Sequence, residues 1–446
     1  MSSVAIDQSI KMTTPASHLL AVRAVTSFVV LTSSTSTWHD LLKEAVLFAG
    51  KVANDLRDEA GYIVQSLRVI TNPFSEYLNC NTANTALEGM DLIKNILKEL
   101  EDTEKDLLRG TRIRFSIGAA DATTLPLVPS LIRSGGDLSN CCINIPVDDC
   151  GVVDAAMVHG AALVCTELGA TTDRGEGNFN FTINFNGPKL CPYFPAGFNT
   201  TESGKTFVIG LEYPDLLVHV LSTLADGRES VVQSPETRSD DWRRASEAMR
   251  VAVEAHLRII VDICRRAEKR MSMVSGGVNS PFIFGGVDSS PAPSKTVQSM
   301  CRVVELLGVP HFGASGTTEC CSMLTRLFKS LGQKEENPVP LVGFSGLMFA
   351  ALEDQGLADA AAMGHYDIQH LLTYSAVCGI GLDTVPIPFE TLPEDIARLA
   401  QDVGAYAFRL NKPLTVRLFP VPGLVAGDMT KFESEDLCNC TVFAVP

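Results

Sequence analysis

Two residue types that can do chemistry stand five positions apart in the segment TYSAVCGIGLDTVPIP, which covers residues 373–388. A thiolate at Cys378 can attack an electrophile, and a carboxylate at Asp383 can take or give a proton. We predict both as catalytic residues, although a packed and inert Cys378 is an equally good interpretation. Positions an odd number apart face opposite sides of a continuous strand, so a shared cavity requires a bulge or turn at Gly379 or Gly381.

Three further carboxylates, at Glu353, Asp354 and Asp428, stand in segments that we expect to end strands or form loops. Carboxylate oxygens at such positions can bind a hard divalent cation, magnesium or calcium, or act as acid and base. The alternative is structural, because Glu353 and Asp354 also precede a predicted helix at 356–363 and could cap it. We predict a divalent-cation site here and keep the capping interpretation open.

Arg417 lies in the apolar sequence TVRLFPV, which we expect to form a buried strand. A guanidinium group there needs an anionic partner, since an unpaired buried charge is costly. That partner is either a protein carboxylate, for which we prefer Asp383, or the carboxylate or phosphate group of a substrate. Arg417 is therefore a predicted substrate-binding residue.

Backbone N–H groups at a helix start can bind anions. The predicted residues of such a turn are Ser315, Gly316, Thr317 and Thr318. We also place Ser345 with the substrate-binding residues, not as a nucleophile, because its segment GFSGL lacks the last glycine of the hydrolase nucleophile motif. In the alternative interpretation, Gly343 and Gly346 allow a tight turn or a close backbone approach. We expect the turn, Cys378 and Asp383 to border one cavity.

Composition limits the function classes. The 446 residues, of which 46% are hydrophobic and 20% charged, are typical of a globular protein with a sizeable core. A formal net charge of −16 argues against nucleic acid and anionic membrane surfaces as partners. No apolar run reaches the roughly 18 residues of a membrane span. The first 17 residues lack a basic region that leads into a long apolar stretch, so we expect a cytoplasmic protein with 13 reduced cysteines.

The apolar patterns alternate between strand and helix along the chain. Predicted strands cover 21–31, 64–70, 112–119, 142–145, 179–185, 206–211, 282–287, 341–349, 376–385 and 415–420, and predicted helices cover 38–59, 84–109, 155–168, 241–271, 294–308, 317–332 and 393–410. This alternation indicates an α/β architecture. We interpret residues 1–17 as a mobile tail and 18–446 as one large domain, with halves at about 18–230 and 241–446.

The chain after Phe282 carries an ordered series of motifs. They are VDSSPAP (287–293), ELLG (305–308), GTT (316–318), GFSG (343–346), EDQG (353–356), AVCGIGLD (376–383) and VRLFPVPG (416–423). In this order they resemble the family catalogued as domain of unknown function number 711. VRAVT (22–26) and RVITNP (68–73) extend the resemblance over nearly the whole chain, while residues 140–230 and the pair Cys320–Cys321 depart from the family's pattern.

The resemblance implies a fold related to the pyruvate-formate-lyase-like barrel, with ten strands in two five-stranded halves surrounded by helices. Kinship of fold does not transfer chemistry. Glycyl-radical enzymes carry an Arg-Val-x-Gly-Tyr loop, whereas this chain has Pro420 where the radical glycine would stand. A proline offers no comparable radical site, so we exclude glycyl-radical chemistry.

We therefore expect an enzyme that acts on a small anionic metabolite in a central cavity, by acid–base or thiol chemistry of lyase or isomerase type. The absence of a dinucleotide-binding fingerprint argues against redox chemistry. The alternatives are a metabolite-binding or regulatory protein without turnover, and a structural oligomer. A homo-oligomer is compatible with each of these.

Overall fold

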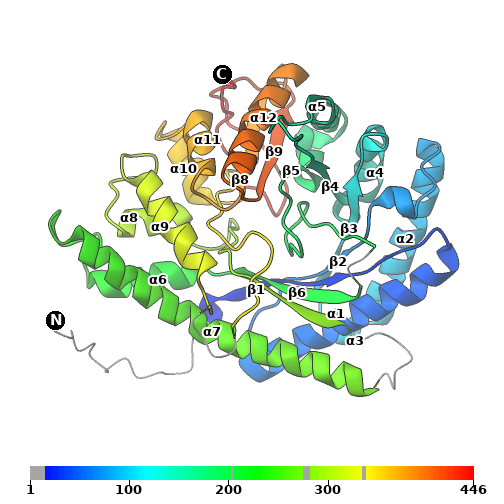
Figure 1. Ribbon diagram of the computed structural model, residues 1–446, viewed down its shortest axis with the longest axis horizontal. Helices are drawn as coiled ribbons and strands as arrows, with labels where there is room; N and C mark the ends of the chain where they lie inside the picture. Colours follow the sequence, from blue (N-terminus) through cyan, green and yellow to red (C-terminus); the bar gives the residue numbers. More distant parts are fainter. Residues whose placement is uncertain (1–15, 202–203, 275–281, 334–337) are drawn as a thin grey trace.

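A curved sheet with helices on its outer side forms the centre of the protein (Figure 1). The structure is a computed structural model, and it describes residues 16–201, 204–274, 282–333 and 338–446. The tail expected at residues 1–17 lies almost entirely outside the described residues. The α/β class predicted from the sequence is confirmed.

The sheet has a central block of five parallel strands and, at each end, a pair of parallel strands that runs in the opposite direction. Its order is β7-β6-β1-β2-β3-β4-β5-β9-β8. Strands β1 to β5 are parallel, and the direction reverses where β6 pairs with β1 and where β9 pairs with β5. The strands are β1 (Ala21–Phe28), β2 (Ser66–Ile70), β3 (Arg112–Ala120), β4 (Asn140–Ile145), β5 (Phe181–Phe185), β6 (Thr206–Glu212), β7 (Ile283–Asp288), β8 (Gly381–Pro388) and β9 (Leu414–Val421).

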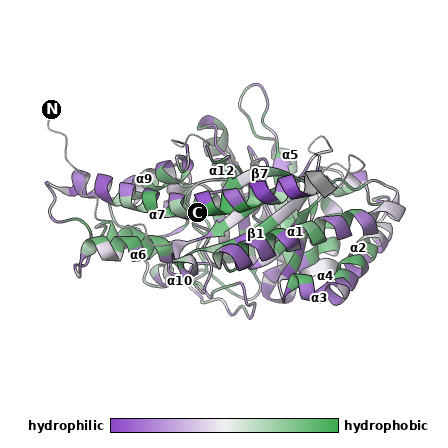
Figure 2. Cartoon of the chain, turned by 90° about the horizontal axis from the view of Figure 1, so that it is seen from below, coloured by the Kyte–Doolittle hydropathy of each residue, from purple (hydrophilic) through white to green (hydrophobic). Residues whose placement is uncertain are grey.

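The helices follow local signals in the sequence. A capping box formed by Thr82 and Thr85 begins α2, and Gly61, with a φ of +71°, ends α1. Figure 2 shows hydrophilic and hydrophobic residues alternating along α1 and α2, as expected for amphipathic helices. The helices are α1 (Trp38–Ala60), α2 (Ala83–Thr103), α3 (Lys105–Leu108), α4 (Val128–Gly135), α5 (Ala155–Thr171), α6 (Pro214–Ala225), α7 (Arg238–Val274), α8 (Met300–Leu306), α9 (Thr317–Lys329), α10 (Gln355–Ala362), α11 (Ile368–Ser375) and α12 (Pro393–Arg409).

The sheet is not closed into the expected ten-stranded barrel. Its edges are β7 and β8. One isolated parallel bridge joins Val287 of β7 to Leu341, and another joins Ala350 to Asp383 of β8. The segment 341–350 thus touches both edges, but among the described residues it forms no strand between them.

Backbone conformation explains why the strand expected at 341–349 is absent. Gly343 has a φ of +63° and Ser345 a φ of +41°, which an extended strand cannot accommodate. A side chain at Gly343 would also place its Cβ 2.1 Å from Asp288 Oδ2. The glycines of this motif therefore serve a tight turn and a close approach, as one interpretation of the sequence predicted.

A loop at residues 186–200 contacts the inner side of the sheet. The Tyr193 hydroxyl donates to the carbonyl of Leu211 at 3.0 Å, and Asn199 Nδ2 donates to the carbonyl of Val29 at 2.8 Å. This loop supplies part of the wall of the cavity described below. Within the described residues, no helix combines the length and apolar composition that crossing a membrane requires.

Candidate functional site

Four arginines reach one cavity from four strands. Arg23 lies on β1, Arg68 on β2, Arg114 on β3 and Arg417 on β9, and all of them line the cavity. Arg68 and Arg114 are register partners on adjacent parallel strands, so their backbones are about 4.8 Å apart. Since β3, β4 and β5 separate β2 from β9 in the sheet, the sheet must curve around this cavity.

The rest of the lining is partly polar and largely apolar. The carboxylates are Glu353 and Asp383, the neutral polar residues are Asn140, Thr182, Tyr193 and Thr415, and the apolar residues are Phe179, Phe194, Pro195, Ala196, Ala292, Pro293, Phe344, Met348 and Ile380. The cavity therefore offers charged groups against an apolar wall.

Arg417 joins the two carboxylates of the cavity. Its Nε donates to Asp383 Oδ1 at 2.6 Å, and its Nη2 donates to Glu353 Oε1 at 2.5 Å. The pairing of Arg417 with Asp383, predicted from one charge in an apolar strand, is confirmed. Burial alone would lower the pKa of Arg417, but Asp383 and Glu353 raise it above its ordinary value. Burial raises the pKa of Glu353, and the charge of Arg417 opposes this effect.

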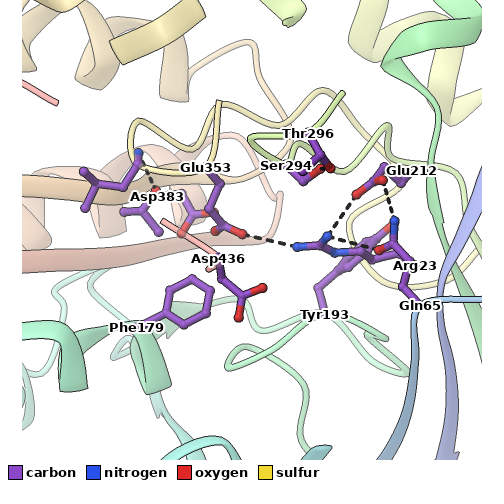
Figure 3. A network of polar contacts seen from close by, with 12 residues as sticks. Arg23, Gln65, Phe179, Tyr193, Glu212, Ser294, Thr296, Glu353, Asp383 and Asp436 are labelled. Carbon is purple, nitrogen blue, oxygen red and sulfur yellow. Dashed lines mark hydrogen bonds and ion pairs between the residues drawn. The ribbon is translucent and has the colours of Figure 1, made fainter. Parts of the chain in front are cut away.

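Arg23 and Arg114 also have carboxylate partners. Arg23 Nη1 lies 2.9 Å from Glu212 Oε2, and its Nη2 lies 3.6 Å from Glu353 Oε2 (Figure 3). Arg114 pairs with Asp436 of the C-terminal segment, and more distantly with Asp137 at 3.5 Å. Protein carboxylates thus already balance both cations.

Arg68 differs from these three arginines, because no carboxylate within the described residues pairs with it. Its Nε donates to Ser66 Oγ at 3.1 Å, and its Nη1 donates to the carbonyl of Pro192 at 3.1 Å. Its guanidinium lies over the ring of Phe194, 4.9 Å from the ring centre. Arg68 is 5% exposed, and burial, together with the charges of Arg114 and Arg23, lowers its pKa to about 9. A buried cation in this state attracts an anion.

Cys378 does not line the cavity that Asp383 borders. Helix α11 ends at Ser375 and β8 begins only at Gly381, so Cys378 lies in the connection rather than on the strand. Its side chain is 1% exposed within the apolar core, where Sγ accepts a hydrogen bond from the N–H of Gly381 at 3.4 Å. The packed interpretation of Cys378 fits this position, and the expected shared cavity is corrected accordingly.

The predicted anion-binding turn also lies away from the cavity. None of Ser315, Gly316, Thr317 and Thr318 lines it. The Thr317 hydroxyl donates to the carbonyl of Ala314 at 2.8 Å and accepts from the N–H of Gly313 at 3.2 Å. These contacts form the N-terminus of α9.

Ser345 has a structural position as well. Its hydroxyl donates to the carbonyl of Val342 at 2.8 Å, and its backbone N–H donates to Asp288 Oδ1 at 2.9 Å. Asp288 is fully buried, and burial raises its pKa. Its carboxylate also accepts the N–H groups of Phe344 and Ser290, so it holds the turn that contains Ser345.

The three carboxylates predicted as a metal site have separate partners. Glu353 pairs with Arg417, while Asp354 caps α10 through the N–H of Leu357 and also accepts from Met300. Asp428 accepts the N–H of Val425 at 2.9 Å. No group of three His, Cys, Asp or Glu side chains in the described part of the chain could hold a metal ion. The capping alternative is confirmed for Asp354.

Sequence reasoning missed Arg23, Arg68 and Arg114 as cavity residues. Each lies in a strand that is otherwise mostly apolar, and that signal alone could have marked them as it marked Arg417. What the sequence does not reveal is the pairing of β2 with β3, which places Arg68 next to Arg114.

Comparison with known proteins identifies the family. The family model described as Uncharacterised ACR (DUF711) matches residues 14–434. The chain belongs to this family. The resemblance read from the motifs after Phe282 is thereby confirmed.

Relatives carry the name UPF0210 protein. The chain is 25% identical over 408 residues to one from Thermoanaerobacter sp. (strain X514), which covers 90% of this chain and 84% of the relative. It is 30% identical over 390 residues to one from Acetivibrio thermocellus, covering 86% and 79%. With one from Pyrobaculum arsenaticum it shares 32% identity over 250 residues, 56% of this chain and half of the relative.

Proposed function

We propose that this protein is an enzyme that binds a small anionic metabolite through Arg68 and converts it by acid–base chemistry of lyase or isomerase type. The observation that carries the proposal is the buried Arg68 guanidinium without a carboxylate partner in the described residues. An anionic group on a ligand would pair with this guanidinium directly and accept hydrogen bonds from Nη2.

Glu353 and Asp383 are the groups that support a proton transfer. Both line the cavity that contains Arg68, and burial raises the pKa of Glu353 above its ordinary value, which makes this carboxylate a better proton acceptor. Glu353 would take a proton from the carbon next to the ligand's acid group, and the electron pair would remain on the ligand as an enolate. Protonated Glu353 would then return the proton to the far carbon of a double bond conjugated with the enolate, whose electron pair forms the new C–H bond as the double bond shifts, while Arg417 offsets the developing negative charge. Thiol chemistry is not part of the proposal, because Cys378 lies outside the cavity.

One observation favours the alternative of a binding protein without turnover. Arg417 donates to both Glu353 and Asp383, which restrains the two carboxylates that would move protons. Such a protein would use Arg68 to bind the same kind of metabolite and would release it unchanged.

A thermal-shift screen of carboxylate and phosphate metabolites tests the proposal. Ligands that stabilise the wild type should fail to stabilise Arg68→Met, while Arg326→Met, which removes an exposed arginine on α9, should respond like the wild type. Each stabilising ligand is then incubated with the wild type and with Glu353→Gln. Product from the wild type and none from Glu353→Gln supports the enzyme, whereas binding without product supports the alternative. If the screen finds no ligand whose binding depends on Arg68, both the enzyme and the binding protein are contradicted.

A further inference from the structure

We infer that the ligand of this cavity is a small monocarboxylate with an apolar body, not a sugar acid, polyol or phosphate ester. This inference deepens the proposed function and rests on it. It follows from which hydrogen-bond donors and charges of the cavity are already engaged within the protein.

The neutral polar side chains of the cavity all donate within the fold. The Thr182 and Thr415 hydroxyls donate at 3.1 Å to the carbonyls of Val416 and Ile380, respectively. The Tyr193 hydroxyl donates to a backbone carbonyl as well. The amide group of Asn140 donates to the carbonyls of Phe115 and Asp137 and accepts from Asn180. A ligand rich in hydroxyl groups could still donate to these oxygen atoms, but these side chains would offer no free donor to its own oxygen atoms, which is unfavourable in a buried site.

Charge selects a carboxylate over a phosphate. The guanidinium groups of Arg23, Arg114 and Arg417 already pair with protein carboxylates. A phosphate dianion seeks several cationic or N–H donors, whereas a carboxylate can be satisfied by one guanidinium group. The cavity offers one such group without a carboxylate partner in the described chain, namely Arg68.

The walls around Arg68 suit an apolar body. The ring of Phe194 stacks on the Arg68 guanidinium, and Phe344, Met348 and Ile380 line the same cavity. Methylene groups buried against such a wall favour binding, because their apolar surface is removed from water. The acid group would lie at Arg68, with the apolar body against these side chains.

Calorimetric titration of the purified protein tests the ligand class with defined probes. The acids are 4-methylpentanoate and 3-phenylpropanoate, each compared with its neutral amide, with gluconate and with inorganic phosphate. We expect at least one of the two acids to bind about tenfold more tightly than its amide, gluconate or phosphate, a difference of about 1.4 kcal/mol. The binding should be lost in Arg68→Met and retained in Arg326→Met. In the otherwise wild-type protein, Phe194→Ala should weaken the binding of 3-phenylpropanoate more than that of acetate, which is added as an acid without an extended apolar body.

The outcomes distinguish failure of the ligand class from failure of the proposed function. If gluconate or phosphate binds through Arg68 as tightly as the apolar acids, the ligand class is overturned and the anion site stands. If neither apolar acid binds the wild type more tightly than its amide, the ligand class is equally overturned, whether or not Arg68→Met folds. If no probe shows Arg68-dependent binding, the proposed function is contradicted together with it.

Discussion

Four arginines in one cavity differ in what surrounds each guanidinium group. Three have carboxylate partners from the protein, and Arg68 has hydrogen bonds to Ser66 and Pro192 and a ring contact with Phe194. The difference matters because removing one member of a buried ion pair leaves the other charge uncompensated. Loss of Arg417 should therefore lower the stability of the fold, and loss of Arg68 should lower ligand binding.

Arg417→Met should lower the free energy of unfolding by roughly 3–5 kcal/mol, because it leaves Asp383 and Glu353 buried without their cation. Urea denaturation measures this change. Arg398→Met, which breaks an exposed pair with Asp395 on α12, is the control and should cost less than about 1 kcal/mol. Equal stability of Arg417→Met and the wild type would remove the structural role of the pair.

Glu353 should make stability depend on pH. Burial raises its pKa, so the folded chain holds this proton more tightly than the unfolded chain does. Its contribution to the free energy of unfolding is therefore full below the ordinary glutamate pKa of about 4.3 and is lost as the pH rises through the folded-state pKa. Denaturation across this pH range should show a smaller decline in Glu353→Gln than in the wild type, because only the contribution of Glu353 is removed. Exposed Glu390→Gln should retain it.

At the scale of the elements, contacts between segments that are distant in sequence hold the fold together. Segment 341–350 touches both edges of the sheet through single bridges and is held at its turn by Asp288. Helix α7 lies against the first half of the chain through His256, whose Nδ1 is 2.9 Å from the Tyr62 hydroxyl. Both contacts join parts that are distant in sequence.

Gly343→Ala should destabilise the protein more than Gly364→Ala. Both glycines have a positive φ, +63° and +70°, so both substitutions pay the strain of about 1 kcal/mol. Only at Gly343 would the new Cβ also meet the Asp288 carboxylate, since nothing lies within 4 Å at Gly364. Thermal denaturation of the two variants compares them. Equal losses would show that the contact with Asp288 does not constrain the turn.

His256 should cause a loss of stability in acid. Burial lowers its pKa to about 4, so the unfolded chain takes up the proton first as the pH falls below about 6.5. The contribution of neutral His256 is thus present above pH 6.5 and is lost on going down to pH 4, a change of about 3 kcal/mol. In His256→Gln the loss should be smaller by that amount, whereas exposed His219→Gln should match the wild type. An unchanged acid profile in His256→Gln would contradict this assignment.

Local patterns predicted most elements, because helix periodicity and capping residues act over a few positions. The first residues of α9 and α12, Thr317 and Pro393, and the first residue of β3, Arg112, follow from such signals. The connection around Cys378 was predicted as strand from its apolar residues, but α11 continues to Ser375 before the chain turns. The positive φ of Ser345 likewise depends on its contacts with Asp288, which no local pattern contains.

The whole molecule is organised by the curvature of one sheet. Curvature brings Arg68 of β2 and Asp383 of β8 to one cavity, although β3, β4, β5 and β9 separate their strands. The position of Arg417 in an apolar strand predicted its pairing with Asp383. The grouping of the four arginines depends on the order of the strands in the sheet, which no local sequence pattern contains. The division into halves at about 230–241 stays a prediction.

A crystal structure of the protein soaked with 3-phenylpropanoate or 4-methylpentanoate tests directly whether Arg68 binds the acid group of a ligand. We predict electron density for a carboxylate within about 3 Å of Arg68 Nη2, with the apolar body against Phe194. A carboxylate bound elsewhere in the molecule, with Arg68 contacting only Ser66, Pro192 and Phe194, would contradict the claim.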